Sequence, residues 1–330
     1  MTSNFDVVGI GNAIVDVLAK TQDAFLRKHG LTKGTMTIID AEMAETLYEQ
    51  MGPATKISGG SAANTIAALA SLGSKTAFIG KVRNDELGDL FRQDIRAMGV
   101  YFVTDPKADG PPTARSFILV TPDAERTMQT FLGSCVELGP EDIDPVLIAR
   151  SSVTYLEGYL WDPPQAKKAF VKAAKIAMQA GKTVSLSLSD PFCVKRHRIE
   201  FVSFVNNHVS LLFANEEEIK SLYRVKTFDE AVQKVRGQCK IAVLTRGEKG
   251  SVVITEEKTH VLDAKRVKKV VDTTGAGDAY AAGFLYGYTR GKDLSTCARL
   301  AGGTASEIIR HYGARPKMDL SKLLEETLDC

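Results

Sequence analysis

The sequence has few cysteines, and their arrangement suggests neither a disulfide framework nor a metal site. Five cysteines are scattered over 330 residues, and no two of them form a Cys-x-x-Cys pair. Such spacing is typical of reduced thiols, so we expect a cytoplasmic protein. None of the five histidines lies in a metal-spaced cluster, and no Gly-x-Ser-x-Gly motif occurs. These absences disfavour zinc enzymes and hydrolases.

Long hydrophobic runs and an excess of charge of one sign are also missing. Nowhere do about 18 apolar residues follow one another, so the sequence predicts no membrane-spanning helix. The first six residues carry no basic charge, and we expect no secretory signal. The 42 Lys and Arg against 40 Asp and Glu leave a net charge of +2. We therefore expect neither a membrane nor a nucleic acid as partner.

Short apolar runs of strand type alternate with helical patterns along most of the chain, which is 44% hydrophobic. The strand patterns cover residues 5–11, 76–79, 153–156, 183–188, 211–214, 241–245 and 251–254, and the helical ones 61–72, 85–98, 164–180, 228–236 and 278–289. This alternation predicts an α/β fold: a doubly wound, mainly parallel sheet with helices on both faces.

Two segments interrupt the alternation. Residues 33–40 and 113–131 have the pattern of antiparallel strands, and the second segment turns at residues 121–125. They form either a small β-sheet lid or a plain edge hairpin. We assign residues 15–40 and 105–131 to a small lid domain, and residues 1–14, 41–104 and 132–330 to a large domain.

The strongest local signal is Asp-Thr-Thr-Gly-Ala-Gly-Asp at residues 272–278, followed by a helical pattern. Small residues before a helix let the main-chain N–H groups of Gly275, Ala276 and Gly277 converge on an anion. Asp278 is then either a carboxylate that compensates the helix dipole or a base that accepts an alcohol proton.

Two further motifs place polar groups after glycines. Gly59 and Gly60 permit a close backbone approach, and Asn64 lies one helical turn further; the alternative is a plain helix cap at Ser61. Asn12 and Asp16 follow the first strand, at the sheet edge where α/β folds bind ligands. The dinucleotide fingerprint fails there, and the chain has no P-loop.

Three weaker candidates have strong structural alternatives. Asn215 and Glu218 either help to hold Mg²⁺ or simply begin a helix. Residues 245–250 form either a strand-ending turn or a phosphate-binding loop. Residues 159–161, Tyr-Leu-Trp, belong to the core or form a ligand platform, and Arg126 is by default a surface charge.

Taken together, these motifs resemble a known family. Gly59-Gly60-x-x-x-Asn64 and Asp272-Thr-x-Gly275-Ala-Gly277-Asp278 resemble the two signatures of the ribokinase-like (phosphofructokinase-B type) carbohydrate kinases. Asn215-x-x-Glu218 and Thr245-x-Gly247 resemble the intermediate motifs of that family. Within it, the segments 11–16, 23–31, 186–192 and 305–310 are similar to those of the adenosine kinases. The resemblance implies an ATP-dependent kinase, most closely one that converts adenosine to AMP.

The resemblance also implies roles for individual residues. Those that hold the nucleoside would be Asn12, Asp16, Gly59, Gly60, Asn64, Tyr159 and Leu160. Those that carry catalysis would be Asp278 as base, Gly275, Ala276 and Gly277 as anion hole, and Arg126 as lid arginine. Those that bind ATP would be Asn215, Glu218, Thr245, Gly247, Gly250, Gly302 and Ser306, with Asn215 and Glu218 also organising Mg²⁺.

Several alternatives stay open at this point. The chain departs from the family pattern at Thr274, where Asn is frequent, and at Gly302, where the animal enzymes carry bulkier residues. A kinase for ribose, fructose, inosine or guanosine is the nearest alternative, and a non-catalytic nucleoside sensor is one of another class. We expect a monomer or a homodimer.

Overall fold

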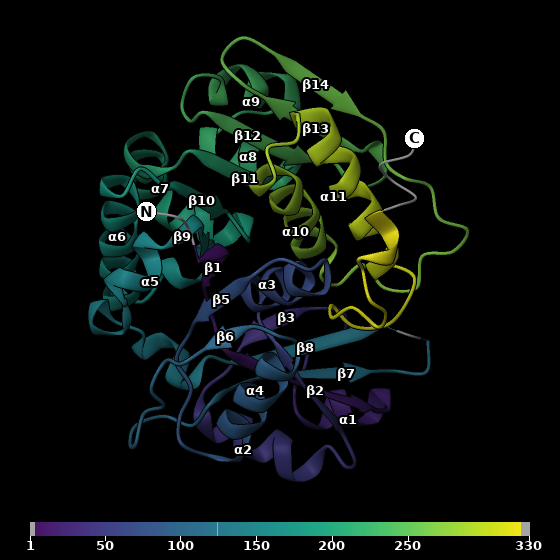
Figure 1. Ribbon diagram of the computed structural model, residues 1–330. Helices are drawn as coiled ribbons and strands as arrows, with labels where there is room; N and C mark the ends of the chain where they lie inside the picture. Colours follow the sequence, from purple (N-terminus) through teal and green to yellow (C-terminus); the bar gives the residue numbers. More distant parts are fainter. Residues whose placement is uncertain (1–3, 124, 325–330) are drawn as a thin grey trace.

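A computed structural model describes residues 4–123 and 125–324, which fold into two β-sheets with flanking helices (Figure 1). The strands of the larger sheet are β1 (Phe5–Ile10), β5 (Thr76–Ile79), β6 (Tyr101–Phe102), β9 (Ser151–Glu157), β10 (Thr183–Ser187), β11 (Leu211–Asn215), β12 (Ile241–Thr245), β13 (Ser251–Ile254) and β14 (Thr259–Leu262). Their order is β14-β13-β12-β11-β10-β9-β1-β5-β6. All pairs from β12 to β6 are parallel, whereas β13 and β14 are antiparallel to their neighbours.

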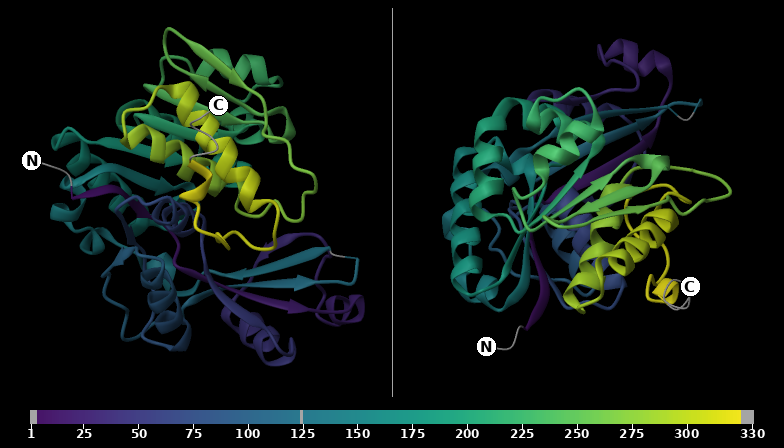
Figure 2. Two further views of the ribbon diagram at one scale, coloured as in Figure 1. Left: turned by 45° about the vertical axis from the view of Figure 1, so that its right-hand side comes forward. Right: turned by 90° about the horizontal axis from the view of Figure 1, so that it is seen from above.

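Helices cover both faces of this sheet, which confirms the predicted doubly wound fold (Figure 2). Their bounds are α1 (Asp23–Lys28), α2 (Ala41–Gln50), α3 (Ser61–Ser71), α4 (Glu86–Ala97), α5 (Pro145–Ala149), α6 (Pro164–Gln179), α7 (Pro191–His208), α8 (Glu216–Tyr223), α9 (Phe228–Val235), α10 (Ala276–Thr289) and α11 (Leu294–Ile308). In the view from above, α10 and α11 lie on one side of the sheet and α6 and α7 on the other. None of the described helices is long and apolar enough to cross a membrane.

The two faces have separate apolar cores because successive strand residues point to opposite sides. Val7 of β1 packs in a cluster with α3 and α10, and the next residue, Val8, packs in a cluster with α6 and α7. The first cluster continues through Val15 and Val17 to Leu47 of α2. The small sheet therefore shares its core with one face of the large sheet.

The small sheet consists of β2 (Ile14–Lys20), β3 (Met36–Ile38), β4 (Thr55–Gly59), β7 (Ala114–Val120) and β8 (Arg126–Phe131), in the order β3-β8-β7-β2-β4. The antiparallel β7–β8 pair is as predicted, although residue 124 of its turn lies outside the described residues. The prediction for residues 33–40 was wrong in direction, since β3 runs parallel to β8. The strands β2 and β4 were not anticipated. Strand β4 belongs to the small sheet although it lies inside the range 41–104 that we assigned to the large domain. The division into two domains stays a prediction.

The parallel strands deliver polar side chains to one edge of the large sheet. Asn12 follows β1, Glu157 ends β9, Asn215 ends β11 and Thr245 ends β12. Parallel strands end at the same edge, so all four residues lie on the side where open α/β sheets bind ligands.

Candidate active site

Asp278 lies at the centre of the candidate site, in the first turn of α10. Its Oδ1 accepts a hydrogen bond from Ser61 Oγ at 2.6 Å, and its Oδ2 accepts one from Asn64 Nδ2 at 3.1 Å. Both donors come from the first turn of α3, so the two glycine-rich motifs meet although more than 200 residues separate them. Ser61 is not the helix cap that we considered, because Gly60 occupies that position.

The loop before α10 leaves room beside the helix N-terminus. Gly275 is the N-cap with a φ of +76°, a left-handed conformation that favours glycine. A Cβ at Gly275 would collide with Ala314, whereas a Cβ at Gly277 would meet nothing within 4 Å. The exposed Gly277 thus borders open space at the positive end of the helix dipole, where a phosphate fits.

The turn between β4 and α3 packs closely against two of the predicted ribose-binding residues. A Cβ at Gly59 would come within 2.5 Å of Asp16 Oδ2. Gly60 has a φ of +94°, and a Cβ there would collide with the main-chain oxygen of Asn12. Any side chain at either glycine would therefore displace Asp16 or Asn12. Asn64 is 7% exposed, and its Oδ1 has no hydrogen-bond partner among the described residues, so it is available to a ligand hydroxyl.

Glu157, which the sequence did not single out, holds this arrangement together from β9. Its Oε1 accepts from Asn12 Nδ2 at 2.6 Å, and its Oε2 accepts from the main-chain N–H of Ala62 at 2.8 Å. A Cβ at Gly11 would collide with the Glu157 carboxylate. One buried side chain thus fixes both the end of β1 and the start of α3. The only sequence signal for the role of Glu157 was its position at the end of an apolar strand.

The site gathers several carboxylates, and burial is the main cause of the rise in their pKa values. Burial raises the pKa of Asp278 to about 6, against the hydrogen bonds from Ser61 and Asn64. Burial also raises the pKa of Asp16 to about 7, against the attraction of the Arg315 guanidinium, and the charge of Asp278 adds to the rise. Asp278 is therefore ionised at pH 7 and becomes protonated as the pH falls below about 6. A carboxylate in that range suits a general base.

Arg126 lies close to the Asp-Thr-Thr-Gly motif rather than at the surface. Its guanidinium bonds both carboxylate oxygens of Asp272 at 2.7 Å and also donates to Thr274 Oγ1 at 2.7 Å. The ring of Tyr312 lies 5.5 Å from the same group. The small sheet is thus tied to the loop before α10 through its arginine. Whether Arg126 also approaches a phosphoryl group stays a prediction.

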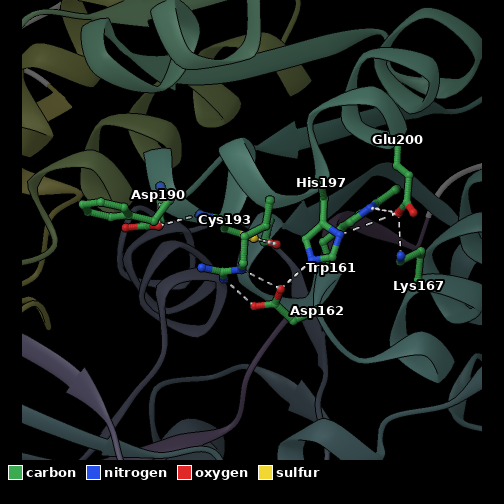
Figure 3. A network of polar contacts seen from close by, with 10 residues as sticks. Trp161, Asp162, Lys167, Asp190, Cys193, His197 and Glu200 are labelled. Carbon is green, nitrogen blue, oxygen red and sulfur yellow. Dashed lines mark hydrogen bonds and ion pairs between the residues drawn. The ribbon is translucent and has the colours of Figure 1, made fainter.

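The segment Tyr159-Leu160-Trp161 is fixed against α7 by the polar network in Figure 3. Trp161 Nε1 donates to Glu200 Oε2 at 2.8 Å, and the Trp161 ring stacks on Phe201. Leu160 is only 1% exposed and packs in the core. The core occupies its side chain, and its contact with the substrate stays a prediction. Tyr159, at 37% exposure, is still accessible to a ligand.

Asn215 and Glu218 begin helix α8, which is one of the two roles that we considered for them. Asn215 is the N-cap of α8: its Oδ1 accepts from the Glu218 N–H, and the Glu218 carboxylate accepts from both the main-chain N–H and the Nδ2 of Asn215. The Glu218 side chain is buried, and no group of three or more His, Cys, Asp or Glu with metal-site geometry occurs among the described residues. Each side chain is engaged by the other, and the role of these two residues in organising Mg²⁺ stays a prediction.

Within the described residues, none of the remaining predicted ATP residues hydrogen-bonds Asp278. Thr245 is in register with Asn215 at the edge of the sheet, and Gly247 is exposed in the turn that follows. A Cβ at Gly250 would collide with the main-chain oxygen of Leu262, so packing alone accounts for that glycine. On α11, Gly302 faces open space, while Ser306 Oγ donates to the Gly303 oxygen within the same helix. Their contact with ATP stays a prediction.

Comparison with known proteins points to one family of kinases. The description "pfkB family carbohydrate kinase" matches residues 31–320. The crystal structure of adenosine kinase from Sinorhizobium meliloti is 49% identical, with a TM-score of 0.91, and the match covers 98% of this chain and 99% of that one. A probable sugar kinase from Rhizobium etli is equally similar, at 49% identity and a TM-score of 0.92 over 98% and 99% of the two chains.

A more distant relative extends this pattern. Adenosine kinase of Saccharomyces cerevisiae is 25% identical over 330 aligned residues, which cover 93% of this chain and 95% of the yeast protein. The names of these relatives therefore divide between adenosine kinases and a sugar kinase, while each match covers at least 93% of this chain.

Proposed function

The chain belongs to the pfkB family of carbohydrate kinases, and we propose that its acceptor is adenosine, phosphorylated on the 5′-hydroxyl to give AMP. Membership makes it an ATP-dependent phosphotransferase, and the sensor alternative no longer applies. The choice of acceptor depends on the surface that surrounds Asp16.

The face of the small sheet that carries Asp16 is mostly apolar. Residues in register across neighbouring strands share a face, and Asp16 is in register with Ser116 of β7. Two residues further along β2, Leu18 is in register with Ile118, which in turn pairs with Met128 of β8. The opposite face packs into the core, so this row of side chains is directed away from it.

An apolar row beside a carboxylate supports a nucleoside better than a free sugar. The carboxylate would accept the two ribose hydroxyls, and a flat base would cover Leu18, Ile118 and Met128. A free hexose or pentose has hydroxyls on every side, and those facing the apolar row would lose their partners. A base that buries about 100 Å² of apolar surface gains about 2.5 kcal/mol, or roughly fiftyfold in affinity.

The proposed chemistry needs little beyond positioning and charge. Asp278, ionised above about pH 6, accepts the proton of the 5′-hydroxyl as that oxygen attacks the γ-phosphorus of ATP, and the bond from this phosphorus to the β,γ-bridging oxygen breaks to release ADP. The main-chain N–H groups around Gly277 and the dipole of α10 stabilise the negative charge that develops on the phosphoryl oxygens. Ser61 and Asn64 fix the carboxylate toward the acceptor.

ATP is the phosphoryl donor that the family implies, and the open space at Gly277 fits one of its phosphates. Mg²⁺ prefers oxygen ligands and retains its waters, so it would enter bound to the phosphates of ATP. None of the residue roles proposed above depends on its coordination.

A panel of acceptors tests this proposal. With ATP as donor, kcat/KM is measured for adenosine, inosine, guanosine, ribose and fructose. We expect adenosine to exceed ribose by about fiftyfold, the value estimated from base burial. Preferred turnover of ribose or fructose would instead support the sugar-kinase alternative, which the similarity to the Rhizobium etli protein favours.

A further inference from the structure

Arg315 reaches into the candidate site from the segment that follows α11. Its Nε donates to the main-chain oxygen of Ser58 at 3.0 Å, and its Nη1 donates to that of Ala63 at 2.9 Å. Its Nη2 is buried and has no hydrogen-bond partner among the described residues. The guanidinium is thus anchored by main-chain oxygens on either side of the Gly59–Gly60 turn, and one donor group remains free.

The charge of Arg315 is shared among three carboxylates. Asp16, Asp94 and Asp278 all attract it, and within the described residues none of them forms an ion pair with it. Asp94 also accepts a hydrogen bond from the Ser58 N–H at 2.9 Å, so both main-chain groups of Ser58 are held. Among residues 4–123 and 125–324, no other cation is anchored to this turn; Arg126, the second positive group that attracts Asp16, is bound to Asp272.

We propose that Arg315 is a positioning residue for the acceptor: its main-chain bonds hold the Gly59–Gly60 turn against Asp16 and Asn12, and its positive charge favours the ionised forms of Asp16 and Asp278. The inference rests on the proposed function, in which an ionised Asp278 accepts the proton. This inference adds Arg315 to the acceptor site, although Arg315 lies after α11 and outside both signature motifs.

The electrostatic need for such a cation follows from the groups that face the two carboxylates. Asp16 and Asp278 repel each other, and Glu157 and Glu218 add further negative charge near Asp278. Burial raises the pKa of Asp16 to about 7 and that of Asp278 to about 6 even with Arg315 in place. Removing the cation removes an attraction that lowers both values. Both pKa values then rise, and the ionised form of Asp278 is lost at a higher pH.

The test is the pH profile of kcat/KM for the acceptor that the panel identifies. In Arg315→Met, which has similar length and no charge, we expect the midpoint of the acidic limb to move upward by about one pH unit. The control is Arg310→Met, because Arg310 is exposed and bonds only Glu307; its profile should match that of the wild type. A purely structural role for Arg315 would lower kcat/KM equally at every pH, and an unmoved midpoint overturns the proposal.

If Arg315→Met does not fold, Arg315→Gln replaces it, because glutamine has no charge but can still donate to a main-chain oxygen; its acidic midpoint should also move upward. Arg315→Lys separates the charge from the main-chain bonds. Lysine keeps the charge but cannot reproduce the fixed fork that donates to both Ser58 and Ala63. We expect a lower melting temperature with an unchanged acidic midpoint. A midpoint that moves upward in folded Arg315→Lys contradicts the proposal. If wild-type protein phosphorylates none of the acceptors, the proposed function fails first and this inference fails with it.

Discussion

Replacing Asp278 by asparagine is expected to lower kcat by at least about a hundredfold, the usual loss for a positioned general base. The amide has the same shape but cannot take up the proton of the attacking hydroxyl. Its oxygen can still accept from Ser61, and the unpartnered Oδ1 of Asn64 can accept from the new NH₂ group after that side-chain amide rotates. The site should therefore keep its form while losing its base.

The measurement compares turnover with binding. We expect the dissociation constant for adenosine, measured by calorimetry, to stay within about threefold of the wild-type value, since the base is used in the chemical step and not for affinity. Asp229→Asn, an exposed residue in the first turn of α9, is the matched control and should leave both quantities unchanged. Near-normal turnover of Asp278→Asn would exclude Asp278 as the base.

Replacing Asp16 by alanine is expected to raise the KM for adenosine by about a hundredfold or more. Each hydrogen bond to an ionised carboxylate contributes about 1.5–3 kcal/mol, and two ribose hydroxyls would be lost as partners. The change should affect acceptor binding and leave the KM for ATP nearly unchanged. Because the pKa of Asp16 is about 7, this carboxyl is already largely protonated while Asp278 titrates near pH 6, so the acidic limb of the pH profile should stay where it is in the wild type.

The unmoved acidic midpoint expected for Asp16→Ala contrasts with the upward movement expected for Arg315→Met, so the two variants check each other. Asp109→Ala is the control for Asp16→Ala, because Asp109 is exposed in the segment before β7. An unaltered KM for adenosine in Asp16→Ala would mean that the ribose lies elsewhere.

The sequence predicted the parts of the site that depend on local backbone geometry. Gly60 and Gly275 mark helix starts where only a residue without a side chain fits, and such positions can be recognised from a few neighbouring residues. The parallel strands that carry Asn12 and Thr245 to one edge followed from hydrophobic alternation. Asn64 and Asp278 could be expected to meet only through the resemblance to a family, since 214 residues separate them.

What the sequence did not predict are single residues whose importance comes from tertiary contacts. Glu157 and Arg315 belong to no short motif, and their partners lie up to 257 residues away along the chain. Strand β2 was missed because polar and small residues such as Asp16 interrupt its apolar pattern. Asn215 and Glu218 form a helix capping box, which uses the same residue types at the same spacing as the predicted Mg²⁺ motif, so the sequence alone does not separate the two roles.

The central claim is that Asp278 and the ribose-holding residues share one acceptor pocket, and a crystal structure with bound adenosine tests it most directly. The account predicts the two ribose hydroxyls on the Asp16 carboxylate and the 5′-oxygen within hydrogen-bond reach of Asp278, about 2.6–3.2 Å. The base should lie against Leu18, Ile118 and Met128. Adenosine bound with its 5′-oxygen beyond the reach of Asp278, or with its ribose away from Asp16, would contradict the account.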